Sequence, residues 1–161
     1  MLGDLVGSMK EHADRGQFTD ILGVIFSELD LGSSKAGQFF TPAGVADLLA
    51  GITLNRHCLV NEIARKGFVS LQEPACGGGG LLLAFCQKML REGMNPQEHL
   101  IIHANDIDRR CVCMTYLQLS IYYIPAVVTH GDALNDKHLG ACWYTPAYKE
   151  GMWQLREEGV T

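Results

Sequence analysis

Four consecutive glycines, residues 77–80, separate two apolar segments and constrain the fold of this chain more than any other feature. Residues 68–71 have the composition of a short strand, and residues 81–90 form a strongly apolar stretch of helical length. A strand that passes through a glycine turn into a helix is typical of a parallel α/β unit. Because glycine has no Cβ, a ligand can approach such a turn closely, although a flexible connector without a ligand is the alternative.

The alternation of strand and helix continues after this turn. Further strands are expected at 100–104 and 126–129. Between them, a helix is expected to begin after Asp108 and to run to about Tyr123, because Pro125 stops it. Strand, helix, strand, helix and strand with short connections predict an α/β fold, in which a parallel sheet has right-handed crossovers.

Three helices are expected before the glycine turn. The first two cover residues 2–12 and 18–31, and either Thr19 or Asp20 can cap the start of the second. The third follows Pro42, since proline is tolerated in the first turn of a helix. Apolar residues recur on one face of this third helix: Val45, Leu48, Leu49 and Ile52.

The two ends of the chain differ from its centre. Residues 32–37 are expected to form a flexible loop, which divides the single domain into an N-terminal helical segment, 1–36, and a core, 37–161. Residues 135–161 are polar and contain several glycines, so no helix or strand is assigned to them.

Composition restricts the class of protein. The 161 residues suffice for one domain with a sizeable core. A formal net charge of −5 argues against tight DNA binding by this chain alone, because proteins that neutralise phosphates are normally basic. We expect no signal peptide, since the acidic start lacks a basic region, and no membrane span, since no apolar run approaches ~20 residues.

The cysteines lack the spacing of a metal or redox site. No C-x-x-C pair occurs, so zinc-ribbon and thioredoxin-type sites are not expected. We expect reduced, structural cysteines, no metal site and a cytoplasmic location. The six cysteines are Cys58, Cys76, Cys86, Cys111, Cys113 and Cys142.

Three acidic residues stand at the ends of the three expected strands: Glu73, Asp106 and Asp132. In a sheet ordered 3-2-1 all three would lie at one edge, where α/β proteins bind ligands. An acid after the second strand can accept hydrogen bonds from ribose hydroxyls, although a single Asp in a turn is more often a turn former or a helix cap. The glycines do not follow the G-x-G-x-x-G pattern and no P-loop lysine is present, so a ligand without phosphates is favoured.

Four segments along the chain resemble motifs of one family. They are G-Q-F-F-T-P at 37–42, E-P-A-C-G-G-G-G at 73–80, A-N-D-I at 104–107 and G-D-A-L at 131–134. In order and spacing they are similar to motifs X, I, II and III of N6-adenine DNA methyltransferases, above all the modification subunits of type I restriction systems. The resemblance covers roughly residues 15–135. It implies a Rossmann-like S-adenosylmethionine-dependent methyltransferase fold with a truncated parallel-type sheet.

The resemblance also implies S-adenosylmethionine as the cofactor and a pocket that holds it. Glu73 would lie near the charged amino group of the cofactor, Asp106 would bind its ribose hydroxyls, and Asp132 would bind the exocyclic amine of its adenine. Core packing is the alternative for the two phenylalanines of the first motif. The other implied pocket residues are Phe39, Phe40, Thr41, Pro42, Ala75, Cys76, Gly77, Gly79, Ile107 and Ala133.

The chain departs from this family at the residues that hold the target base. Members carry N-P-P-aromatic after a fourth strand, where polar groups bind the amine of the adenine and the ring stacks on the flipped base. No two of the five prolines here are adjacent. The nearest substitute is the segment 145–148, in which Tyr148 would stack and Thr145 would be a weaker acceptor. Methyl transfer depends on positioning, so we expect very low activity from these two candidate catalytic residues.

Three functions are therefore considered. The first is an S-adenosylmethionine-dependent DNA adenine-N6 methyltransferase, and the second is a catalytically degenerate, cofactor-binding regulatory or anti-restriction-type interaction protein of a mobile element. The third is a small-molecule methyltransferase or nucleotide-binding protein of similar topology. Binding to DNA is expected to be weak for this chain alone. A homo-oligomer or a partner subunit is expected to cover the edge of the sheet beside the first strand, where a neighbouring strand is missing.

Overall fold

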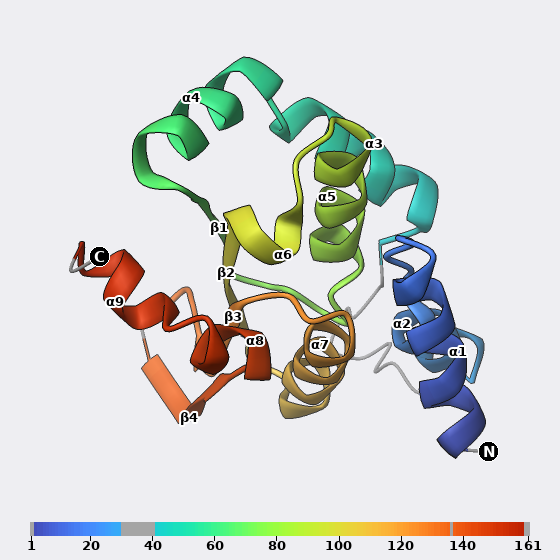
Figure 1. Ribbon diagram of the computed structural model, residues 1–161. Helices are drawn as coiled ribbons and strands as arrows, with labels where there is room; N and C mark the ends of the chain where they lie inside the picture. The colour runs from blue at the N-terminus through green and yellow to red at the C-terminus, as the bar shows by residue number, and fades with distance from the viewer. Residues whose placement is uncertain (1, 30–40, 136, 160–161) are drawn as a thin grey trace.

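A computed structural model describes residues 2–29, 41–135 and 137–159 of the chain (Figure 1). Its strands alternate with helices in the centre, as expected for an α/β protein, and helices dominate both ends. In chain order the elements are α1 (Leu2–Asp14), α2 (Ile21–Glu28), α3 (Ala43–Thr53), α4 (Arg56–Lys66), β1 (Val69–Glu73), α5 (Gly80–Arg91), α6 (Pro96–His99), β2 (Leu100–Asp106), α7 (Arg109–Ile121), β3 (Ala126–Asp132), β4 (Lys137–Tyr144), α8 (Pro146–Glu150) and α9 (Trp153–Glu157).

The four strands form one open sheet in the order β1-β2-β3-β4. The first three strands are parallel, with Val69 opposite Leu100 and Ile102 opposite Ala126, so their carboxyl ends share one edge. This arrangement confirms the expected α/β class and the expected 3-2-1 order. The fourth strand, which was not assigned from the sequence, runs antiparallel to β3. Among the described residues, β1 has a strand neighbour on one side only.

The sheet has a larger and a smaller apolar core, one on each face. Successive side chains of a strand point to opposite faces, so Ile102 lies in the larger core and Ile101 in the smaller one. Helices α5 and α7 cover the first face, and α8 and α9 cover the second (Figure 1). Helix α5 contributes much of the larger core, since Leu82, Phe85 and Met89 are all buried.

The helices before the sheet differ in detail from the expected ones. Helix α2 begins at Ile21, because the carboxylate of Asp20 accepts the amide of Gly23 and caps the helix there. The apolar face expected on α3 does not face the core. This helix packs on α5 and buries Ala46 and Ala50 instead, so its larger apolar side chains lie at the surface: Val45, Leu48, Leu49 and Ile52.

Five further elements were absent from the expectation: α4, α6, β4, α8 and α9. Helix α4 has a polar sequence and buries no residue fully, but its ends carry local signals. Asn55 caps its first turn and Gly67, at φ 83°, ends it in the left-handed conformation. Helix α8 likewise begins with Thr145 as its cap, followed by Pro146 in the first turn.

Candidate functional site

The last two residues of β2 accept hydrogen bonds from the glycine turn. The carboxylate oxygen Oδ2 of Asp106 accepts the amide of Gly77 at 2.8 Å, and the carbonyl of Asn105 accepts the amide of Cys76 at 2.9 Å. Gly77 and Gly79 have φ angles of 54° and 95°, which favour glycine. The last residue of β2 is therefore bonded directly to the turn that follows β1.

Helix α7 holds the carbonyl groups of the same turn. The hydroxyl of Thr115 donates to the carbonyl of Gly77 at 2.9 Å, and the side-chain amide of Gln118 donates to the carbonyl of Gly78 at 2.7 Å. Both side chains are fully buried. A Cβ at Gly79 would lie 3.2 Å from the Thr115 hydroxyl, a tight contact, and the φ of 95° favours glycine there in any case. These two residues of α7 were not singled out from the sequence, where they are part of an ordinary helical pattern.

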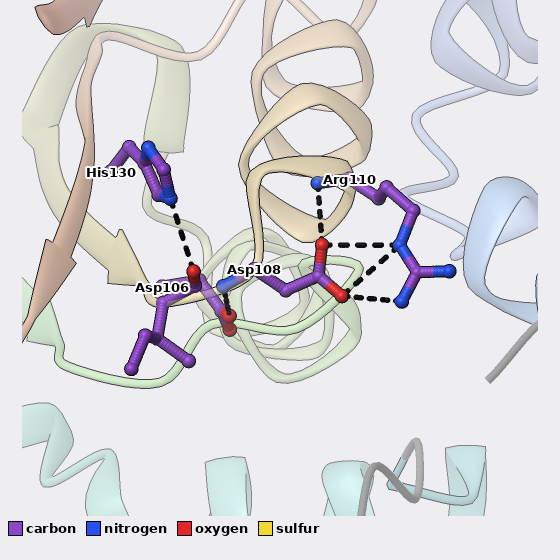
Figure 2. Close-up of polar contacts among 5 residues, drawn as sticks. Asp106, Asp108, Arg110 and His130 are labelled. Atoms are coloured by element: carbon purple, nitrogen blue, oxygen red, sulfur yellow. Dashed lines mark hydrogen bonds and ion pairs between the residues drawn. The ribbon is translucent and has the colours of Figure 1, made fainter. Parts of the chain in front are cut away.

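The second acid, Asp106, binds the backbone of two segments: the glycine turn and the start of the connection to α7. Its side chain is only 8% exposed, and its other oxygen, Oδ1, accepts the amide of Asp108 at 2.8 Å. Asp108 then caps α7 by accepting the amide of Arg110, and it pairs with the Arg110 guanidinium at 2.6 Å (Figure 2). This ion pair raises the pKa of Arg110 above its usual value. From β3, the ring of His130 donates to the carbonyl of Ile107 at 3.0 Å (Figure 2).

The other two acids also support the backbone after their strands. Glu73 accepts the amide of Ala75 at 3.1 Å. Asp132 accepts the amides of Leu134 and Asn135, and the side chain of Asn135 donates to it at 2.6 Å. The hydrogen bond from Asn135 lowers the pKa of Asp132, so its charge is maintained at neutral pH.

One side-chain amide links the chain after β1 to the end of β3. The side-chain nitrogen of Asn105 donates to the carbonyl of Pro74 at 3.1 Å and to the carbonyl of Gly131 at 3.0 Å. Because Asn105 lies in β2, it fixes the chain after β1 relative to the end of β3. The three acids thus share one braced surface, called the carboxyl edge below: residues 73–80, 106–108 and 131–135.

Most of the residues expected in a cofactor pocket meet at this carboxyl edge. The structure brings together Glu73, Ala75, Cys76, Gly77, Gly79, Asp106, Ile107, Asp132 and Ala133. Thr41 and Pro42 line a cleft of about 590 Å³ together with Asp20 and Gly80, the first residue of α5. Phe39 and Phe40 lie outside the described residues.

Cys76 lies within the turn but has little chemical reactivity of its own. Its side chain is buried, and burial raises the pKa of its thiol to about 12. The thiol therefore stays protonated at neutral pH, where a thiolate would be needed for nucleophilic chemistry. All six cysteines, which fall within the described ranges, are free.

The two candidate catalytic residues lie at the opposite end of the sheet. The hydroxyl of Thr145 accepts the amide of Ala126, the first residue of β3, at 2.9 Å and donates to the carbonyl of Ile124 at 2.8 Å. Tyr148 is 7% exposed and packs in the smaller core with Ile101. Because β3 spans six residue steps of about 3.3 Å, its two ends are roughly 20 Å apart. The structure therefore does not bring Thr145 and Tyr148 to the carboxyl edge.

Two absences within the described ranges bear on the class of site. No group of three or more His, Cys, Asp or Glu residues in them could hold a metal ion. None of the helices in them has the length and apolar character to cross a membrane.

Comparison with known proteins gives one family and one relative. Residues 13–147 match the family described as N-6 DNA Methylase. Over 133 residues the chain is 27% identical to a curated protein of Methanocaldococcus jannaschii, the type I restriction enzyme MjaIX methylase subunit. This similarity covers 83% of the chain but 20% of the relative, so the chain spans about a fifth of the length of that protein. No solved structure matches the chain.

Proposed function

The chain belongs to the N-6 DNA methylase family, and from that premise we propose that its carboxyl edge binds S-adenosylmethionine as part of a DNA adenine-N6 methyltransferase. The observation that carries this proposal is the hydrogen bond from Gly77 to Asp106. It joins the glycine turn after β1 to the acid at the end of β2, at the edge where α/β sheets bind nucleoside ligands. Proteins of this family generally use S-adenosylmethionine.

The residues of the carboxyl edge fit the chemistry of such a cofactor. Each oxygen of Asp106 accepts one backbone amide, and a carboxylate oxygen has a second lone pair that a ribose hydroxyl can use. Ile107 is 60% exposed and offers apolar surface to an adenine ring. Glu73 would attract the cofactor's ammonium group, and Asp132 would accept a hydrogen bond from the exocyclic amine of its adenine. The bound cofactor would supply a methyl group on a positively charged sulfur.

We propose that the groups that position the target base come from another subunit. Thr145 and Tyr148 are tied to the amino end of β3, and no two prolines of the chain are adjacent. The name of the similar protein describes a subunit of a larger enzyme. A partner subunit, or a second copy of the chain, could pair with the edge of β1 that has no strand neighbour among the described residues, and so complete the site. With a net charge of −5, the chain alone would bind DNA weakly.

A second candidate function shares the cofactor but not the reaction. Thr145 is fully buried, and Tyr148 packs in the smaller core with Trp153 of α9. Their burial favours a regulatory or anti-restriction-type protein that binds S-adenosylmethionine without transferring its methyl group. The two candidates predict the same cofactor affinity and differ only in methyl transfer to adenine.

Calorimetry with S-adenosylmethionine tests the shared part of both candidates. We expect binding by the wild-type protein, and a loss of at least tenfold in affinity in Asp106→Asn and Asp106→Ala. The matched control is Asp14→Ala, which removes an exposed acid at the end of α1. Absence of binding by the wild type, or equal affinity in all four proteins, would contradict the proposed site.

A labelled methyl group then separates the two candidates. The protein is incubated with S-adenosylmethionine labelled in its methyl group and with unmethylated DNA, and label on adenine is measured. Label above the level of a no-protein control supports methyl transfer by this chain alone. Cofactor binding without label supports either the regulatory function or a requirement for base-binding groups from another chain.

A further inference from the structure

A short N-terminal segment is held against the core by three long side chains. This segment, called the docking segment below, comprises residues 16–23 and leads into α2. Gln87 of α5 accepts the amide of Phe18 at 2.9 Å, and the hydroxyl of Tyr122 donates to the carbonyl of Thr19 at 2.8 Å. The ring of Phe18 also packs edge-on against Tyr122, with ring centres 5.6 Å apart. These contacts bridge about 70 to 100 residues of sequence.

The third side chain, Gln118, contacts both the docking segment and the glycine turn. Its amide nitrogen donates to Asp20 Oδ1 at 2.7 Å and to the carbonyl of Gly78 at 2.7 Å. Its amide oxygen accepts the backbone amide of Leu22 at 3.2 Å. A side-chain amide has two hydrogens to donate, so this one nitrogen is shared between the segment and the turn. Gln118 is fully buried, and either contact would be costly to lose.

Asp20 also lies directly against the last glycine of the turn, Gly80. A Cβ at Gly80, where α5 begins, would lie 2.6 Å from Asp20 Oδ2. A Cβ at Gly23 would lie 2.2 Å from the same oxygen. A side chain at either glycine would therefore displace the Asp20 carboxylate. It also caps α2 by accepting the amide of Gly23 at 2.8 Å, so a shift of the turn displaces the start of α2.

We propose that Asp20 and Gln118 are positioning residues that couple the docking segment to the cofactor turn, so that S-adenosylmethionine binding tightens this segment. The inference rests on the proposed function, because the turn must bind the cofactor. Gly78 belongs to the turn, and Gln118 and Asp20 transmit its position to the amides of Leu22 and Gly23. By linkage, the docked segment in turn favours cofactor binding by the same factor.

The amides of Leu22 and Gly23 report this coupling directly, because Gln118 and Asp20 bind them. Their hydrogen exchange is measured by NMR in the wild-type protein with and without S-adenosylmethionine. We expect saturating cofactor to slow their exchange by about tenfold, a typical size for such coupling. A purely structural role of Gln118 would leave the two rates unchanged. This measurement needs no variant, so it holds even where a substitution prevents folding.

A matched pair of variants locates the coupling. Gln118→Leu removes the contact with the turn and the segment together, whereas Gln87→Leu removes a contact of the segment with α5 alone. We expect cofactor affinity to fall about tenfold in Gln118→Leu and Asp20→Ala, and to stay within about twofold of wild type in Gln87→Leu. Equal losses in Gln118→Leu and Gln87→Leu would overturn the coupling.

The outcomes also separate this inference from the proposed function. Cofactor binding by the wild type, with unchanged exchange at Leu22 and Gly23 and wild-type affinity in Gln118→Leu, overturns the coupling and leaves the proposed function standing. Absence of cofactor binding by the wild type overturns both.

Discussion

Asn105 and Gly131 fit so closely that a side chain at position 131 would force Asn105 to move. A Cβ there would lie 2.6 Å from Asn105 Oδ1 and 3.0 Å from the carbonyl of Lys137. The same Asn105 amide donates to the carbonyls of Gly131 and Pro74, and so links the chain after β1 to the end of β3. The glycine of this segment is thus required by a neighbouring strand rather than by its own φ angle.

Substitution of Gly131 tests this fit. We expect Gly131→Ala to lower the free energy of unfolding by about 1–3 kcal/mol, since overpacking forces the Asn105 side chain or the backbone to move. Unfolding in urea gives the value. The control is Gly51→Ala in the interior of α3, where a Cβ meets nothing within 4 Å. That change should stabilise the protein by up to about 1 kcal/mol, because alanine favours a helix more than glycine does. A Gly131→Ala protein as stable as the wild type would contradict the close contact.

Thr145 is predicted to be structural rather than catalytic. Thr145→Val removes a buried hydroxyl that bonds Ala126 and Ile124, so we expect a loss of about 1–3 kcal/mol in stability. Cofactor affinity should stay at the wild-type level, because the carboxyl edge lies at the other end of β3. Urea unfolding and calorimetry on the same protein sample measure both quantities. A large loss of affinity with unchanged stability would refute this placement.

The buried thiols predict a loss of stability at alkaline pH. Burial raises the pKa values of Cys76 and Cys111 from the ordinary value of 9.0 to about 12. Above about pH 9 the unfolded chain releases these protons while the folded protein retains them, so the free energy of unfolding falls as the pH rises toward about 12. Urea unfolding at a series of pH values, from neutral to moderately alkaline, follows this decline. In Cys76→Ala with Cys111→Ala the decline should be shallower, and an identical slope in both proteins would count against buried, protonated thiols.

On α3, substitution of a large apolar residue should affect stability less than substitution of a small one. Ile52 is 73% exposed, so Ile52→Gln should change stability by no more than about 0.5 kcal/mol. Ala50 is 1% exposed where α3 packs on α5, and Ala50→Leu should cost about 1–3 kcal/mol. Thermal unfolding of the two variants compares them. The reverse order of sensitivity would show that the larger apolar residues form the packed face.

The alternation of strands and helices between 68 and 132 was predictable because each element there has a strong local signal. Asp108 caps α7, and glycines end or begin the neighbouring elements. On α3 the periodic pattern identified the helix but not its packed face, because close packing on α5 selects small side chains such as Ala46. Helix α4 has a polar sequence without a buried stripe, although the caps Asn55 and Gly67 could have marked its ends.

The acidic residues of the candidate site could be predicted from the sequence, but the side chains that hold its backbone in place could not. Glu73, Asp106 and Asp132 follow from their places at strand ends, where parallel topology brings them to one edge. The supports at Asn105, Thr115 and Gln118 depend on contacts between distant segments, and polar residues within apolar elements do not reveal their partners. Thr145 and Tyr148 were assigned by resemblance of a short segment, which carries no information on the direction of β4. The antiparallel course of that strand leads the chain back to the amino end of β3.

The central claim, that S-adenosylmethionine binds at the carboxyl edge, is tested most directly by NMR titration of the wild-type protein with the cofactor. We predict that the largest shifts of backbone amide signals fall on Gly77, Asp106, Ile107 and Ala133, while Thr145 and Tyr148 at the amino end stay unchanged. An absence of shifts at saturating cofactor, or shifts centred on 145–148, would contradict it.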